Sequence, residues 1–112
     1  MYKFLSMLVV LVVMVVDVTA YTPYENGSNI SAIGEPCIEG RTVALNGVPL
    51  GSIVIYDGQR FIVEDRVGRD GILDIFMNDY HRAIQFGRKR QQTIEVIIQW
   101  VVGKKVVEYT QN

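Results

Sequence analysis

Two short apolar runs that contain aspartates, residues 61–65 and 72–76, constrain most strongly what this chain can fold into. β-Branched and aromatic residues in runs of this length, bounded by Gly, Asp and Arg, are typical of β-strands. The period of two along a strand predicts that Asp65 shares a face with Val63 and that Asp74 lies between two apolar side chains. Apolar neighbours desolvate a carboxyl group and raise its pKa, which suits an acid that works near neutral pH. Solvated turn residues are the alternative interpretation of this pattern.

Local turn signals predict a β-hairpin and one short helix in the second half of the chain. An Asp-Gly pair joins residues 52–56 to residues 60–65, and this pair is a strong hairpin signal. A short helix is expected next, capped by Asn78 or Asp79 and ended by Gly87.

Three further expectations concern the remaining segments. Residues 93–102 and 105–109 are expected to form a second hairpin. Trp100 lies in an apolar strand and is therefore expected in the core. The loop of residues 24–38 is long for a small domain, so it is expected to line a functional site.

The composition limits the classes of protein to which this chain can belong. The 112 residues hold one domain with one small core. The chain has eleven basic and twelve acidic residues, and no segment alternates Lys or Arg with aromatic residues. No nucleic-acid partner is therefore expected. The single cysteine, Cys37, excludes an internal disulfide and is expected to be a small buried hydrophobic residue. His81 has no second ligand at a suitable spacing, and the aspartates lack the spacing of calcium loops, so neither metal nor cofactor is expected.

The first 20 residues have the pattern of an export signal. Lys3 provides a positive charge, residues 4–16 are mostly apolar, and residues 18–20 form a small-residue cleavage pattern. The apolar run is shorter than the ~20 residues that span a bilayer. Residues 1–20 are therefore predicted to be a signal peptide or a short membrane anchor with transient membrane contact, followed by a domain at 21–112. In the alternative interpretation, the β-branched residues 12–18 extend the first strand of the domain.

Four blocks of sequence, in order, resemble the three-aspartate (3D) domain family between Thr19 and Ile97. The blocks are Thr19-Ala20-Tyr21-Thr22-Pro23-Tyr24; Gly40-Arg41-Thr42-Val43-Ala44 with Pro49-Leu50-Gly51-Ser52; Val63-Glu64-Asp65-Arg66 with Leu73-Asp74-Ile75-Phe76; and Ala83 with Phe86-Gly87-Arg88. The resemblance implies an all-β fold, a six-stranded double-psi β-barrel with one short helix. It also implies a relation to the catalytic domain of membrane-bound lytic transglycosylase A and to the stationary-phase survival proteins, which cleave peptidoglycan glycan strands.

The chain departs from the family pattern at two places. The first of the three aspartates falls at Asn46, so only Asp65 and Asp74 remain for acid chemistry. The link of residues 66–73 is short and contains no lysine, so substrate binding by a family lysine does not carry over.

The resemblance implies an exported enzyme, a lytic transglycosylase, whose partner is peptidoglycan. Asp74 is expected to be the catalytic acid and base, and Asp65 its catalytic partner, which holds the proton of Asp74 by like-charge repulsion or orients the sugar. Side chains expected to bind substrate are aromatic ones that stack on sugar rings and arginines that contact carboxylates: Tyr21, Phe76, Arg66 and Arg69. A non-catalytic wall-binding module and a plain glycosyl hydrolase stay open as alternatives, as does the oligomeric state.

Overall fold

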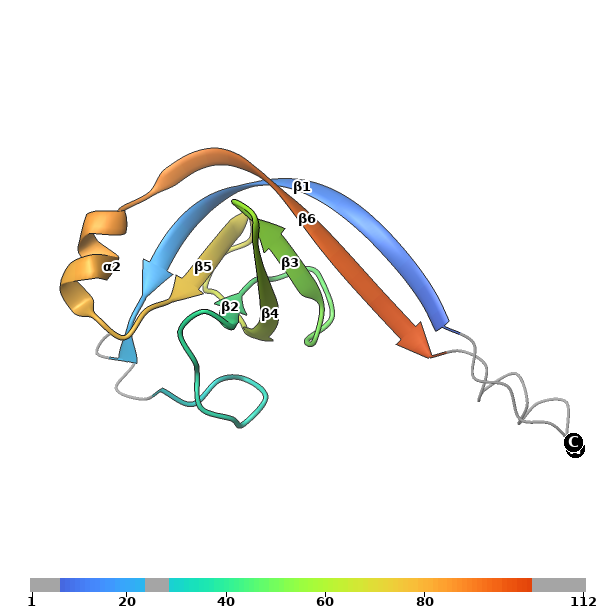
Figure 1. Ribbon diagram of the computed structural model, residues 1–112, viewed down its shortest axis with the longest axis horizontal. Helices are drawn as coiled ribbons and strands as arrows, with labels where there is room; N and C mark the ends of the chain where they lie inside the picture. Colours follow the sequence, from blue (N-terminus) through green and yellow to red (C-terminus); the bar gives the residue numbers. More distant parts are fainter. Residues whose placement is uncertain (1–6, 24–28, 102–112) are drawn as a thin grey trace, which may run out of the picture.

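The computed structural model describes residues 7–23 and 29–101, and every structural statement below refers to these residues. They contain six strands and one short helix: β1 (Met7–Tyr21), β2 (Thr42–Ala44), β3 (Ile53–Tyr56), β4 (Gln59–Asp65), β5 (Ile72–Phe76), α2 (Tyr80–Phe86) and β6 (Lys89–Val101). The strands close into a barrel in the order β1-β5-β2-β4-β3-β6, and β6 returns to β1 (Figure 1). The expected all-β barrel of six strands with one short helix is confirmed.

Aliphatic side chains that alternate along the strands fill the barrel interior. Val18 on β1, Val43 on β2, Val63 on β4, Leu73 on β5 and Val96 on β6 are fully buried in one cluster. Successive side chains of a strand point to opposite sides of the sheet. The neighbours of these core residues therefore lie on the outer side of the barrel wall, which carries the candidate site.

An irregularity in the pairing of β2 with β4 moves Asp65 to the outer side. The two strands are parallel, and the register shifts from Val43 opposite Val63 to Ala44 opposite Asp65. One extra residue, Glu64, is accommodated by this β-bulge. The prediction that Asp65 shares a face with Val63 was wrong, because a strict period of two assumes an unbroken ladder.

The expected hairpin and helix are both present. Strands β3 and β4 pair antiparallel, with Tyr56 opposite Gln59 across the Asp-Gly turn. Asp79 caps α2 by accepting a hydrogen bond from the backbone N–H of Arg82 at 3.0 Å. Gly87 ends the helix with a φ of 66°, a left-handed conformation that glycine adopts without strain.

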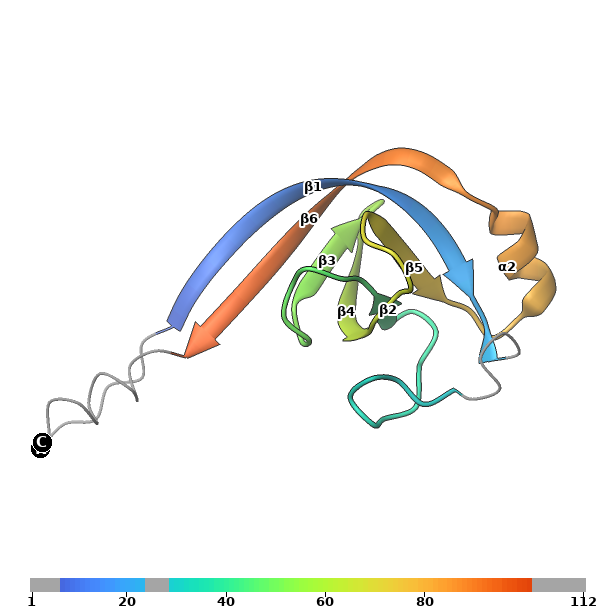
Figure 2. The same cartoon turned by 180° about the vertical axis from the view of Figure 1, so that it is seen from behind.

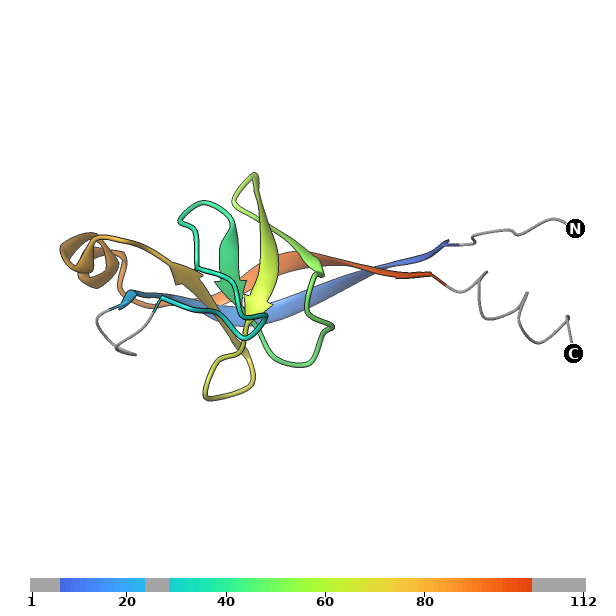
Figure 3. The same ribbon diagram turned by 90° about the horizontal axis from the view of Figure 1, so that it is seen from below.

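The strand β1 runs far beyond the barrel. Its last residues, Asp17–Tyr21, pair in parallel with β5, whereas its first part pairs antiparallel with β6. The paired segments 7–15 and 93–101 are called the arm below. Residues 95–97 of β6 still pair with β3, and the strand ends beyond them extend together away from the other strands (Figures 2 and 3). Residues 12–18 thus lie within β1, as the strand alternative expects, while export and cleavage stay predictions.

Two other expectations concern the arm and its surroundings. Trp100 is 41% exposed near the end of the arm, so its predicted core position was wrong. The strand around it is apolar, but β6 leaves the barrel before this residue. The second strand of the predicted second hairpin, residues 105–109, lies outside the described residues. Across the described ranges, no helix is long and apolar enough to cross a membrane.

Candidate functional site

Four residues form a row across four neighbouring strands on the outer side of the barrel wall. Thr19 of β1 lies opposite Asp74 of β5, Asp74 lies opposite Ala44 of β2, and Ala44 lies opposite Asp65 of β4. Neighbouring strands are separated by about 4.8 Å, so the Cα atoms of the two aspartates are about 10 Å apart. The structure thus brings the two predicted catalytic carboxyl groups to one face, with the small, buried side chain of Ala44 between them.

Asp74 occupies the position that the sequence predicts for it. It is half-buried, and the neighbours on its own face, Ile72 and Phe76, are 9% and 1% exposed. The hydroxyl of Thr19 donates a hydrogen bond to Asp74 Oδ1 at 2.9 Å. The carboxyl group therefore has a defined orientation and an apolar surround, and it remains partly accessible to solvent.

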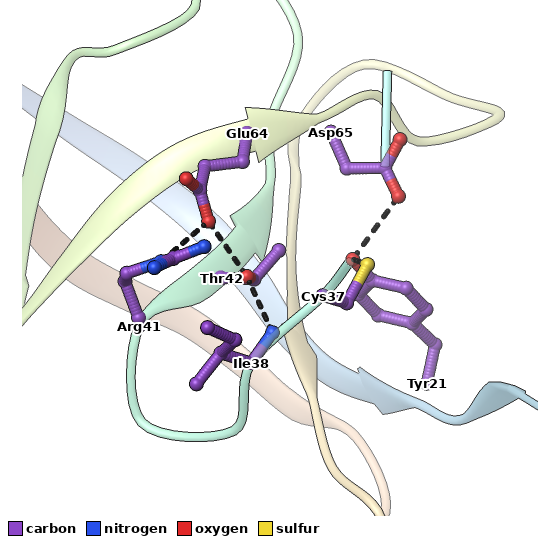
Figure 4. A network of polar contacts seen from close by, with 7 residues as sticks. All are labelled: Tyr21, Cys37, Ile38, Arg41, Thr42, Glu64 and Asp65. Atoms are coloured by element: carbon purple, nitrogen blue, oxygen red, sulfur yellow. Dashed lines mark hydrogen bonds and ion pairs between the residues drawn. The ribbon is translucent and has the colours of Figure 1, made fainter. Parts of the chain in front are cut away.

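Asp65 is held by three hydrogen-bond donors. The backbone N–H of Arg66 donates to Oδ1 at 2.9 Å, the N–H of Ala32 to Oδ1 at 3.2 Å, and the hydroxyl of Tyr21 to Oδ2 at 3.1 Å (Figure 4). Ala32 belongs to the long loop, so the described part of that loop contacts the site as expected. Such a carboxyl group acts as a fixed acceptor that ties the loop and β1 to β4.

The hydroxyl of Tyr21 lies between Asp65 and Cys37, with its oxygen 3.7 Å from Cys37 Sγ. Burial raises the pKa of the Tyr21 hydroxyl far above its ordinary value, and the contacts with Cys37 and the charge of Asp65 act in the same direction. The hydroxyl therefore keeps its proton and remains a donor at neutral pH. Cys37 is buried, as the sequence predicts, and burial also raises the pKa of its thiol.

Both aromatic rings expected to bind sugar are covered by protein. Tyr21 is 6% exposed and Phe76 is 1% exposed, and they pack edge to face with centroids 5.4 Å apart. Together with Ala44 and Cys37 they form a small apolar cluster outside the barrel. Both rings pack within the protein, and their expected stacking on sugars stays a prediction. Tyr24 lies outside the described residues.

The two arginines expected to bind substrate differ in their surroundings. Nη1 of Arg66 donates to the carbonyl oxygens of Leu45 and Val48, at 2.8 and 2.7 Å. This side chain braces the segment that follows β2, a structural role that the sequence did not predict. Arg69 is exposed on the link between β4 and β5, where its predicted contact with substrate carboxylates stays a prediction.

Asn46, where the resemblance leads us to expect an aspartate, makes contacts that require an amide. Its Nδ2 donates to the carbonyl oxygen of Val67 at 2.8 Å and to Asp70 Oδ1 at 3.0 Å. Its Oδ1 accepts from the N–H of Val67 at 3.1 Å. A carboxylate has no hydrogen to donate, so an aspartate would face two oxygen atoms here. The asparagine is thus a structural clamp between the end of β2 and the link after β4.

A second polar cluster, next to Asp65, was not predicted from the sequence. Glu64 is 7% exposed, and its Oε1 accepts from Thr42 Oγ1 at 2.7 Å and pairs with Arg41 Nε at 3.0 Å (Figure 4). Thr42 Oγ1 in turn accepts from the N–H of Ile38 at 2.9 Å. The signal for this cluster is a charged residue within an apolar strand, although its partners cannot be identified without the β2–β4 register.

Both aspartates are half-buried on the outer side of the barrel wall. A hollow of about 400 Å³ lies nearby, between the Asp-Gly turn and α2, and residues that include Tyr56, Phe61 and Phe86 line it. Neither Asp65 nor Asp74 is among its lining residues. Within the described ranges, no three His, Cys, Asp or Glu side chains gather in a way that could hold a metal ion.

No protein-family model matches this chain, and no curated protein sequence matches it.

Proposed function

We propose that the chain is a cell-envelope enzyme of the three-aspartate type that cleaves peptidoglycan glycan strands as a lytic transglycosylase. The observation that carries the proposal is the row in which Asp74 and Asp65, both half-buried, lie on one outer face of the barrel wall. The closed barrel with two parallel strand pairs, β1 with β5 and β2 with β4, is compatible with a double-psi topology. An outer face suits a polymeric substrate, which has to lie across the protein.

Asp74 is the proposed catalytic residue. As an acid, it protonates the oxygen that links N-acetylmuramic acid to N-acetylglucosamine, and the bond from that oxygen to the muramoyl C1 breaks. The resulting carboxylate takes the proton of the muramoyl O6 hydroxyl while O6 bonds to C1 and closes a 1,6-anhydro ring. One carboxyl group serves both steps because the nucleophile belongs to the substrate, whereas an ordinary glycosidase needs a second carboxylate.

Asp65 is the proposed positioning residue. Three donors hold its two oxygen atoms in place, so its side chain is fixed relative to the loop and to β1. The two Cα atoms are about 10 Å apart, which weakens direct repulsion between the carboxyl groups. Orientation of the sugar, or of the loop over it, is therefore the role that we favour over like-charge repulsion.

We further propose that the protein works outside the cytoplasm with β1 retained. Val16 and Val18 are buried in the barrel core at 3% and 0% exposure, and cleavage after Ala20 would remove both. Cell fractionation with N-terminal sequencing tests this proposal. Envelope protein that starts upstream of Met7 agrees with it, whereas a functional chain that starts at Tyr21, or protein confined to the cytoplasm, contradicts it.

A non-catalytic wall-binding module is the second candidate. The observation that favours it is Asn46, whose amide clamps the protein where the family pattern has its first aspartate. Digestion of purified sacculi, followed by mass analysis of the soluble products, separates the candidates. Anhydromuramoyl ends support the proposed transglycosylase, reducing ends indicate a hydrolase, and intact glycan that pellets with the protein indicates the binding module.

A further inference from the structure

The arm leaves one edge of β1 without a partner strand among the described residues. Strand β6 pairs with one edge of β1 from Met7 onward, whereas β5 reaches the other edge only from Asp17. The bond from the N–H of Asp17 to the carbonyl oxygen of Gly71, at 3.0 Å, marks where this second edge becomes occupied. The backbone groups of residues 7–15 on that edge are therefore available to another strand.

Among the residues that the structure describes, this open edge has no charge, no proline and no covering strand to protect it. Residues 7–15 contain no charged residue and no proline, and every side chain is apolar. The alternate residues Met7, Val9, Leu11, Val13 and Val15 are 55 to 65% exposed. Natural edge strands usually carry a charge, a proline or a cover that prevents pairing. An edge of this kind is suited to a neutral, apolar partner strand.

The sequence of this edge is nearly palindromic, so two copies that run antiparallel place similar residues opposite each other. Leu8-Val9-Val10-Leu11-Val12-Val13-Met14 reads nearly the same from either end, with Leu11 at its centre. If two copies pair antiparallel about Leu11, then Val9 faces Val13, Val10 faces Val12, and Leu8 faces Met14. A two-fold interface requires such self-complementarity, because the same patch serves both subunits.

We propose that two copies of this chain associate through the open edges of β1, which pair antiparallel about Leu11 and join the two arms into one four-stranded sheet. The partner strand fits the available length, since Met7 of the partner lies opposite Val15 and β5 begins just beyond. The paired segment is about 30 Å long, which places the contact near the small end of stable interfaces, about 1,000 Å² in total. The dimer is therefore expected to dissociate on dilution.

Sedimentation and light scattering of the full-length chain test the proposal. We expect the average mass to rise from that of the monomer toward twice that value between about 1 and 100 µM. Leu11→Lys should abolish this rise, because it places two like charges directly opposite each other on the two-fold axis. Ile84→Lys is the matched control, since Ile84 on α2 is also 58% exposed. It should leave the association unchanged.

A cross-linking experiment covers the case in which Leu11→Lys fails to fold. Residues that face each other across an antiparallel pair have Cα atoms about 4.5 to 5.5 Å apart, within the range that a disulfide spans. Leu11→Cys should therefore form a covalent dimer with oxidised glutathione, whereas Ile84→Cys at equal exposure should not. Equal cross-linking of both variants would overturn the proposal.

Two other results would also overturn the proposal. A chain that stays monomeric throughout the concentration range would show that the edge is covered within one molecule. A chain that is monomeric in solution but floats with vesicles of phosphatidylethanolamine and phosphatidylglycerol would show that the apolar arm faces lipid. Neither result depends on glycan cleavage, so the proposed enzymatic function can fail or succeed independently.

Discussion

Thr19 Oγ1 lies 2.9 Å from Asp74 Oδ1, although 55 positions separate the two residues in the sequence. The parallel register of β1 and β5 makes this contact, because it places Thr19 directly opposite Asp74. The first strand thus orients the carboxyl group that we propose as catalytic. This relationship also explains why the function would depend on β1 being retained.

Replacement of Thr19 tests this positioning role. Thr19→Val keeps the shape of the side chain and removes the hydrogen-bond donor, so we expect glycan cleavage to fall about tenfold, the equivalent of one hydrogen bond of about 1.4 kcal/mol. Thr19→Ser keeps the donor and should retain most of the activity. The measurement is the rate of release of soluble fragments from sacculi. Equal loss in both variants would indicate a packing role instead.

An aspartate at position 46, where the three-aspartate pattern has one, should lower the stability of the protein. Asn46→Asp places a carboxylate opposite the carbonyl oxygen of Val67 and the carboxylate of Asp70, where the amide now donates. We expect a loss of about 1 to 3 kcal/mol in the free energy of unfolding, because both hydrogen bonds that the amide donates are lost and their acceptors face a carboxylate instead. Urea unfolding measures the effect. An unchanged or increased stability would show that the clamp is unimportant.

Thr42 links Glu64 to the loop in front of β2, and replacing it should lower the free energy of unfolding. Thr42→Val leaves buried Glu64 without its hydroxyl donor and the N–H of Ile38 without its acceptor. A buried group left unsatisfied costs about 1 to 3 kcal/mol, and Glu64, which keeps its pairing with Arg41, loses one hydrogen bond of about 1 kcal/mol, so we expect a loss of about 2 to 4 kcal/mol in the free energy of unfolding. Thr93→Val, at an exposed position of the arm, is the control and should change stability little. Similar values for the two variants would contradict the assigned contacts.

Asp17 should make the stability of the folded protein depend on pH in the acidic range. It accepts a hydrogen bond from the N–H of Gln91, a residue with a φ of 51°, and pairs with Arg88. These two contacts lower the pKa of Asp17 below its ordinary value of 3.8. An aspartate whose pKa is lowered by folding stabilises the folded protein at pH values above the pKa of the unfolded chain. This stabilisation is lost as the pH falls through the pKa of the folded protein. The unfolding temperature should therefore decline below about pH 4.

The variant Asp17→Asn should show a shallower decline over this acidic range. The decline should not vanish, because the pKa of Glu39 is also lowered, mainly by its hydrogen bond from Arg82. Calorimetry at a series of pH values compares the two proteins. Parallel curves for the variant and the parent would show that Asp17 does not contribute.

Local signals in the sequence predicted the features that depend on neighbouring residues. The Asp-Gly pair predicted the β3–β4 hairpin, and Asp79 with Gly87 predicted the two ends of α2. Turns and helix caps are determined by residues within a few positions of each other. The position of Asp74 between Ile72 and Phe76 was also correct, since β5 is regular.

Features that depend on distant pairing were missed or misplaced. The bulge at Glu64 arises only when β4 pairs with β2, and it moves Asp65 away from the face that simple alternation predicts. The burial of Tyr21 likewise depends on Phe76 and Cys37, which come from other segments. An isolated apolar run does not reveal such partners. The exposure of the arm could not be predicted from the sequence either, because its composition resembles that of a core strand.

The most direct test of the central claim is the product profile of sacculi treated with Asp74→Asn. Asparagine keeps the shape and still accepts from Thr19, but it has no carboxyl proton to transfer, so we expect anhydromuramoyl release to fall by about a hundred- to ten-thousandfold with the fold intact. Asp65→Asn should lose activity less completely. Asp79→Asn should be unaffected, since asparagine caps helices as well as aspartate. Near-parental release of anhydromuramoyl products by Asp74→Asn would contradict the account.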